Sequence, residues 1–187
     1  MRNTVDRTEA LAAIRARVQN ENLIKHMLVT EAVMRALARR FNQNEDEWGL
    51  VGLIHDIDVE ITQSDPKNHS KMVADLVRQM GASEAMCHAD LCHNEAHGVP
   101  TETLLDKALF CTDPLTGLIT AAALVRQDKK LAGLDADSLK KRFKEKRFAA
   151  GANRQNIASC DRIGLGLDEF LTVGLDAMKS IAPELGL

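Results

Sequence analysis

The chain has no tyrosine, one tryptophan and five phenylalanines, so aromatic side chains make up only 3% of its 187 residues. Strands of sandwiches and barrels favour aromatic and β-branched side chains, and their scarcity argues against both architectures. Alanine and leucine, which favour helices, are abundant instead. We therefore predict an all-α fold.

Long apolar runs and a large excess of one charge are also lacking. No stretch approaches the roughly 18 apolar residues of a membrane-spanning helix, and the charged N-terminal stretch lacks the apolar core of a secretory signal. The net charge of −3 provides no general basic field for nucleic acid. We expect a cytoplasmic protein with no membrane partner and no specific nucleic-acid partner, and the sequence leaves a homo-oligomer open.

Cysteine is scarce too. The four cysteines are too few for a disulfide framework in a chain of this size, and a cytosolic setting would keep them reduced. Most are expected to be small core residues.

The apolar residues recur at intervals of three and four, which predicts a series of helices. Pro114 is expected to end or kink a helix at Asp113, so that a separate helix follows it. A loop is expected over 62–68, where proline and small polar residues gather. The predicted helices span 8–18, 22–41, 45–57, 69–81, 83–98, 101–113, 115–127 and 167–185.

All six histidines fall in one half of the chain, at positions 26, 55, 69, 88, 93 and 97. His26 shares a helical face with Val29, and His55 shares one with Val51, so both imidazoles are expected to point inward. Burying Asp56 beside them without a cation would cost several kcal/mol, whereas a divalent metal turns this burial into coordination energy. The cluster therefore predicts a metal site. Imidazole and carboxylate suit Mn, Fe, Co, Ni or Zn better than Ca.

The order of His26, adjacent His55 and Asp56, and then Asp113, on three different helices, resembles the HD superfamily of metal-dependent phosphohydrolases. Longer stretches resemble a subgroup of small bacterial HD hydrolases over nearly the whole chain: NLIKHMLVTEAVMRALA, GLIHDIDVE, CHNEAHG, DPLTGLITAAALVR and KKRFKEKRFAAGANR. The resemblance implies one all-helical HD domain over 1–187, with a metal-binding core at about 20–127 and a basic, helical C-terminal segment at about 128–187. It also implies hydrolysis of a small phosphorylated compound, such as a nucleotide, by metal-activated water.

The resemblance implies one metal ion bound by His26, His55, Asp56 and Asp113. Relatives with two metals use two further histidines, and His69 and His93 fall in the matching order, with Asp56 as the bridge. The interval between Asp56 and His69 is short, however, and the lysine and Gly-Tyr-Pro signature of cyclic-dinucleotide phosphodiesterases is missing. One or two ions of Mn, Fe, Co, Ni, Zn or Mg are expected, with His55, Asp56 and His93 as catalytic residues. Asp58 is expected either to support a metal ligand from behind or to face water, and water is the favoured alternative.

A basic segment, KKRFKEKRF, followed by Arg154, offers cations that suit phosphate. A solvated helix face is the alternative for most of these residues. The candidate substrate contacts are Lys141, Lys144, Lys146 and Arg154, with Asn94 as a further candidate.

The stretch CHADLCHNEAH is compatible with a second type of metal site, because it offers soft ligands in Cys87, His88, Cys92 and His93. Residues five apart on one helix diverge around its axis, and no second ligand pair closes a tetrahedral zinc site. A structural zinc is therefore not expected there, and His88 and His97 are expected to be peripheral.

One alternative function stays open from the sequence alone. The chain could be a non-catalytic metal or nucleotide sensor that retains the HD fold, which would bind its ligand without consuming it.

Overall fold

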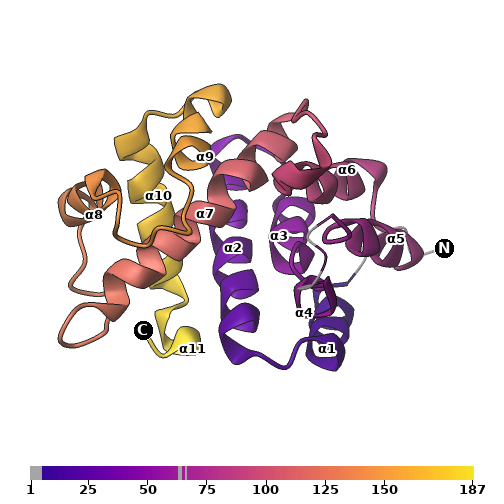
Figure 1. Ribbon diagram of the computed structural model, residues 1–187, viewed down its shortest axis with the longest axis horizontal. Helices are drawn as coiled ribbons and strands as arrows, with labels where there is room; N and C mark the ends of the chain where they lie inside the picture. Colours follow the sequence, from indigo (N-terminus) through magenta and orange to yellow (C-terminus); the bar gives the residue numbers. More distant parts are fainter. Residues whose placement is uncertain (1–5, 63–64, 66) are drawn as a thin grey trace.

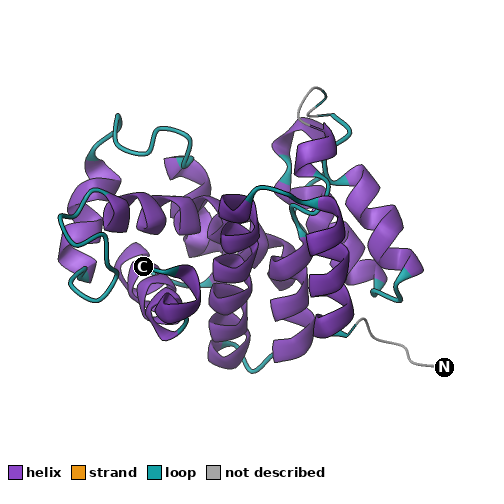
Figure 2. Cartoon of the chain, turned by 90° about the horizontal axis from the view of Figure 1, so that it is seen from below, coloured by secondary structure: helices purple, strands orange, loops and turns teal. Residues whose placement is uncertain are grey.

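The computed structural model describes residues 6–62, 65 and 67–187, and these residues form helices joined by short loops (Figure 1). Within the described residues there is no strand (Figure 2), which confirms the all-α prediction. The predicted loop at 62–68 falls partly outside the described residues. None of the described helices is long and apolar enough to cross a membrane.

Three helices form the centre of the molecule: α2 (Glu21–Arg40), α3 (Glu45–Ile54) and α7 (Leu104–Leu124). Helix α2 packs along α3, and α7 crosses α2 (Figure 1). One side carries α1 (Arg7–Arg17), α4 (Val59–Thr62), α5 (Lys71–Gln79), α6 (Glu84–His93) and the 3-10 turn η1 (Glu95–His97). The other carries α8 (Ala136–Lys144), α9 (Arg154–Ala158), η2 (Ser159–Ile163), α10 (Leu167–Ser180) and α11 (Ala182–Leu185).

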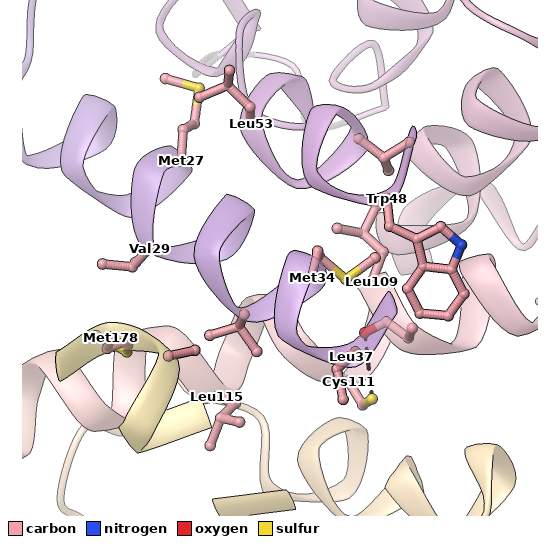
Figure 3. Packing of buried hydrophobic residues seen from close by; sticks show 14 of the residues in the cluster. Met27, Val29, Met34, Leu37, Trp48, Leu53, Leu109, Cys111, Leu115 and Met178 are labelled. Atoms are coloured by element: carbon pink, nitrogen blue, oxygen red, sulfur yellow. Dashed lines mark hydrogen bonds between the residues drawn. The ribbon is translucent and has the colours of Figure 1, made fainter. Parts of the chain in front are cut away.

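The core lies where these central helices meet. Figure 3 shows Met27 of α2 beside Leu53 of α3, and Met34 of α2 beside Leu109 of α7. All four side chains are fully buried. Apolar burial of this kind contributes roughly 1.5–3 kcal/mol per large side chain and holds the three helices in a fixed arrangement.

A glycine sets the distance between α2 and α3. A Cβ atom at Gly52 would lie 2.8 Å from the carbonyl oxygen of Thr30 and 2.9 Å from its carbonyl carbon. Both are backbone atoms of α2 and cannot rotate away, so only glycine allows this close approach. The contact places the end of α3, with His55, directly against the helix that carries His26.

The predicted break at Pro114 was wrong, because α7 continues through this residue from Leu104 to Leu124. A proline inside a helix costs about 3 kcal/mol, since it removes one hydrogen bond and clashes with the preceding turn. Burial of large side chains on both sides of the proline, including Leu109, Leu115 and Ile119, outweighs that cost. Asp113 and Thr116 are therefore held one turn apart on a single rigid helix.

Several predicted helix ends also differ. The third helix ends at Ile54, next to the His-Asp pair as predicted, whereas α5 begins at Lys71 instead of residue 69, which leaves His69 in a turn. Helix α6 begins after its N-cap Ser83, as predicted, but ends at His93 because Asn94 adopts an extended conformation and caps η1. His55 and His69 therefore lie in turns next to helix ends, and His93 is the last residue of α6.

Candidate metal centre

Six predicted site residues come together between the central helices and α5 and α6. His26 comes from α2, His55 and Asp56 from the turn after α3, and Asp113 from the middle of α7. His69 precedes α5, and His93 is the last residue of α6. These residues form two groups of three. The first is His26, His55 and Asp113, and the second is Asp56, His69 and His93. Within each group, one ligand atom from each residue lies within 4.8 Å of those from the other two.

The first group converges through its imidazole Nε2 atoms. The Nε2 atoms of His26 and His55 lie 3.3 Å apart. Asp113 Oδ1 lies 3.0 Å from His26 Nε2 and 3.8 Å from His55 Nε2. His55 is fully buried, whereas Asp113 is about one-third exposed, so the group opens toward solvent at α7.

The second group has the same pattern. The Nε2 atoms of His69 and His93 also lie 3.3 Å apart. Asp56 Oδ1 lies 3.3 Å from His69 Nε2 and 3.7 Å from His93 Nε2. The other oxygen of Asp56, Oδ2, lies 3.5 Å from Nε2 of both His26 and His55. A single carboxylate therefore faces one histidine pair with each of its two oxygens.

The opposite ring nitrogens fix how these imidazoles present their lone pairs. Nδ1 of His55 donates to the carbonyl oxygen of Gly52 at 2.9 Å, and Nδ1 of His93 donates to that of Asp90 at 2.6 Å. A carbonyl oxygen only accepts, so each Nδ1 carries a hydrogen and leaves Nε2 free as a ligand when the ring is neutral.

His26 is oriented through a hydroxyl group. Thr116 Oγ1 donates to the carbonyl oxygen of Asp113 at 2.8 Å and lies 3.1 Å from His26 Nδ1. Because the hydroxyl proton is used on the carbonyl, the oxygen accepts from Nδ1–H of His26. The Nε2 lone pair is thereby directed at the centre, as in His55 and His93.

Asp58 orients the fourth histidine, and the prediction that it faces water was wrong. Its side chain is buried, its Oδ1 accepts from His69 Nδ1 at 2.7 Å, and its Oδ2 accepts from the backbone N–H of Ser70 at 3.0 Å. Ser70 has a φ of 75°, in the left-handed region that favours glycine. Strain of this kind persists only where surrounding contacts hold it, and here the Asp58 carboxylate supplies one.

The charges of the centre favour a bound cation. Burial opposes protonation of His55, but the carboxylates of Asp56 and Asp113 prevail and raise its pKa to about 9. Burial likewise opposes protonation of His69, whose pKa rises to about 10 beside Asp56 and Asp58. Against the effect of burial, His26 and His55 hold the pKa of Asp113 below its usual range. The pKa of Asp56 is held well below its usual range in the same way by His55, His69, His93 and His26. Without a metal, protons provide the positive charge that these carboxylates require.

The donor set fits divalent metal ions. Pairs of Nε2 lone pairs directed at each other at 3.3 Å repel unless a proton or a cation lies between them. Four imidazole nitrogens with two carboxylates suit Mn, Fe, Co, Ni and Zn. The two groups joined by Asp56 match the pattern of a centre with two ions.

The model of the HD domain family matches residues 23–141, which is more than half of the chain and includes every residue of this centre. The chain belongs to the HD domain family. The HD domain is all-helical and is typical of metal-dependent phosphohydrolases.

Two curated relatives are HD-containing proteins named Ribonuclease Y. The one from Syntrophobacter fumaroxidans is 29% identical over 97 residues, which cover 52% of this chain and 18% of the relative. The one from Oleidesulfovibrio alaskensis is 26% identical over 98 residues, with the same coverage of both chains. The present chain thus matches less than one-fifth of the length of these relatives. No solved structure matches it significantly.

A cavity of about 280 Å³ opens beside the centre of this HD domain. Gly151 and Asn153, from the loop at 145–153, form one wall, and Asn94 lies on the wall that carries His69 and His93. The full lining is His69, His93, Asn94, Glu95, Asp113, Pro114, Gly151, Asn153 and Asn156. No lysine or arginine is among these residues, so a phosphoryl group here would depend on the metal centre for positive charge.

Two of the predicted lysines lie next to this cavity. Lys144 and Lys146 line a second, larger cavity of about 660 Å³, and both cavities share Gly151 and Asn153 as lining residues. Lys141 is exposed on α8 and lines neither of them. The structure thus separates Lys141 from the other two candidates.

Arg154 also lines the larger cavity, and its guanidinium bonds to backbone carbonyl groups. Its Nε donates to the carbonyl oxygen of Phe143, and its Nη1 donates to those of Ala149 and Ala152 at 2.9 and 2.6 Å. Its Nη2 donates to the carbonyl oxygens of Arg142, Glu145 and Phe148. The guanidinium thus holds the 145–153 loop in shape and has no nitrogen left over for a phosphate.

Among the residues that orient the ligands, sequence reasoning missed Thr116 and gave the supporting role of Asp58 only as the less favoured alternative. A signal was present for Thr116, because it lies three residues after Asp113 and so shares its helical face. Asp58 gave a weaker signal, since its burial depends on the turn that brings His69 back toward the end of α3.

Proposed function

We propose that this HD domain is a metal-dependent phosphohydrolase with two metal ions, which acts on a small phosphorylated compound such as a nucleotide. The observation that carries the proposal is the position of Asp56, whose two oxygens face two separate histidine pairs. A single carboxylate shared in this way suits a two-metal phosphoryl site better than a single ion.

Divalent ions at such a centre lower the pKa of water and offset the charge that develops on phosphoryl oxygens. The chain contributes a rigid set of ligands, because Gly52, Asp58, Asp90 and Thr116 each fix one imidazole through its Nδ1. Ligands held this way need no reordering when substrate binds.

The cavities support a phosphate ester with a group beyond the phosphate. A phosphoryl group bound in the smaller cavity would lie beside His69, His93 and Asp113. The larger one, across Gly151 and Asn153, offers Lys144 and Lys146 to a second anionic group of the same substrate. A nucleoside diphosphate or triphosphate fits this division better than a phosphomonoester without further charge.

The test is phosphate release from nucleoside monophosphates, diphosphates and triphosphates, with Mn²⁺, Co²⁺, Ni²⁺ or Mg²⁺ added. We expect metal-stimulated turnover that Asp56→Ala abolishes together with bound metal. Asp75→Ala is a matched control, because this carboxylate is 78% exposed on α5 and pairs with Arg78 of the same helix. A short RNA is included because the curated relatives are named ribonucleases.

Binding of nucleotide and metal with no turnover on any of these substrates would favour the sensor instead. Lys144→Ala and Lys146→Ala are expected to raise KM with little change in kcat, because the two lysines would bind the substrate and the transition state equally well. Lys141→Ala is the control from the same basic segment, and its KM is expected to stay unchanged. An unchanged KM in all three variants would indicate that these lysines lie on a solvated surface and do not bind the substrate.

A further inference from the structure

A third group of metal-ligating side chains lies apart from the centre. One ligand atom each from His88, Cys92 and Asp106 lies within 4.8 Å of the others. His88 and Cys92 are one turn apart on α6, and Asp106 is in the first turn of α7. Asp106 precedes Asp113 by two turns, which corresponds to about 10 Å along α7, so this group is distinct from the HD centre.

The contacts within the group are as close as those around a bound ion. His88 Nδ1 lies 3.0 Å from Asp106 Oδ2, and Cys92 Sγ lies 3.4 and 3.8 Å from the two ring nitrogens of His88. Tetrahedral zinc with ordinary bond lengths separates a nitrogen from an oxygen by about 3.4 Å and from a sulfur by about 3.6 Å. The three side chains therefore need little movement to share one ion.

The two oxygens of the Asp106 carboxylate differ in their hydrogen bonding. Its Oδ2 accepts from the backbone N–H groups of Glu102 and Thr103, at 2.9 and 2.8 Å, in addition to the contact with His88. Its Oδ1 is buried and has no hydrogen-bond partner among the described residues, and the side chain is completely buried. A buried carboxylate oxygen without a partner costs about 1–3 kcal/mol or more, which coordination of a cation would offset.

The environments of Cys92 and His88 also suit a bound ion. Cys92 is buried, and its thiol donates to the carbonyl oxygen of Pro100 at 3.3 Å. The His88 side chain is 34% exposed, so an ion can enter from solvent and keep water as a further ligand. Cys87, in contrast, directs its thiol to the carbonyl oxygen of Ala74, and His93 belongs to the HD centre. The tetrad Cys87, His88, Cys92 and His93, which the sequence disfavoured, does not form.

We propose that His88, Cys92 and Asp106 form an additional site for a thiophilic divalent cation such as Zn²⁺, which fastens α6 to the start of α7. Binding replaces the thiol proton of Cys92, which leaves to solvent, with the ion. Both helices carry residues of the HD centre, since His93 ends α6 and Asp113 lies on α7. The ion would hold these two supports together without taking part in the reaction.

Cobalt(II) separates this site from the HD centre, because only a thiolate ligand gives a sulfur-to-cobalt charge-transfer absorption in the near ultraviolet. The experiment adds Co²⁺ to the metal-stripped, reduced full-length chain and to four variants, each checked for folding by circular dichroism. We expect the band in the unsubstituted protein, in Cys87→Ala and in Asp56→Ala, which retains the site while the HD centre is impaired. Cys92→Ala and His88→Ala are expected to lose or strongly weaken it.

Failure of this proposal is distinguishable from failure of the proposed function. A folded protein that gives no charge-transfer band with excess Co²⁺ would overturn the additional site, whatever its turnover. A band that survives Cys92→Ala, or disappears in Cys87→Ala, would overturn it as well.

Discussion

Replacing Asp58 by asparagine tests whether the orientation of His69 controls metal binding. The Asp58 carboxylate accepts two hydrogen bonds in a buried position, from His69 Nδ1 at 2.7 Å and from the N–H of Ser70 at 3.0 Å. Asparagine has the same shape but only one accepting end. If its oxygen faces Ser70, its NH₂ group faces His69 and favours the tautomer with hydrogen on Nε2, which cannot bind a metal.

The expected loss follows from that change. Removing the partner of a metal-bound histidine typically lowers metal affinity about 10–100-fold, which corresponds to about 1.4–2.7 kcal/mol. The loss should fall on the ion held by Asp56, His69 and His93. The ion held by His26, His55 and Asp113 should keep its affinity, because the hydrogen bonds of the Asp58 carboxylate go to His69 and Ser70 instead.

The assay is calorimetric titration of the metal-free protein with Mn²⁺, which resolves two binding events of different affinity. Asp75→Asn is the matched control, since it makes the same chemical change at an exposed position of α5. An Asp58→Asn protein that binds both ions as tightly as the unsubstituted protein would refute the reasoning. An equal loss of affinity for both ions would also contradict the reasoning, since it would indicate a general loss of structure.

Three further predictions concern the supports of the centre. Gly52→Ala should lower the free energy of unfolding, measured by chemical denaturation, by about 1–3 kcal/mol and weaken metal binding, because its Cβ would meet the α2 backbone. Gly117→Ala is the control and should leave the free energy of unfolding unchanged, because a Cβ at this position meets nothing within 4 Å. Ser70→Gly should raise the same free energy by about 1 kcal/mol, since it relieves a positive φ and removes a buried hydroxyl without a partner; a loss of stability would contradict this. With pKa values of about 9 and 10, His55 and His69 are protonated at neutral pH, so filling both sites should release about two protons, measured by calorimetry in buffers of different ionisation enthalpy. Metal affinity should therefore rise with pH up to about 9–10, and affinity independent of pH would contradict this assignment.

The protonated histidines also affect the metal-free fold. Both pKa values lie above the ordinary 6.5, so the ion pairs of His55 and His69 with their carboxylates stabilise this fold fully below about pH 6.5. That stabilisation is lost as the pH rises through about 9 and 10.

Much of this architecture could be predicted because it depends on local periodicity. The repeated apolar spacing predicted an all-α chain, and the inward faces of His26 and His55 followed from their helical neighbours. The break predicted at Pro114 failed because a local rule met a stronger tertiary effect, the burial of side chains on both sides of that residue.

The residues that support the ligands could not be found in this way. Asp58 is buried only because the chain returns through His69 after a short helix, and no periodicity encodes that return. The charge of Arg154 predicted a phosphate contact, whereas its nitrogens donate to backbone carbonyl groups of α8 and of the loop at 145–153. The meeting of His88 and Cys92 with Asp106 likewise depends on the packing of α6 against α7.

The most direct test of the central claim is anomalous diffraction from crystals of the protein grown with Mn²⁺. The account predicts two manganese peaks on opposite sides of Asp56, one among His26, His55 and Asp113 and the other beside His69 and His93. A single peak at this carboxylate, or none, would contradict a two-metal centre.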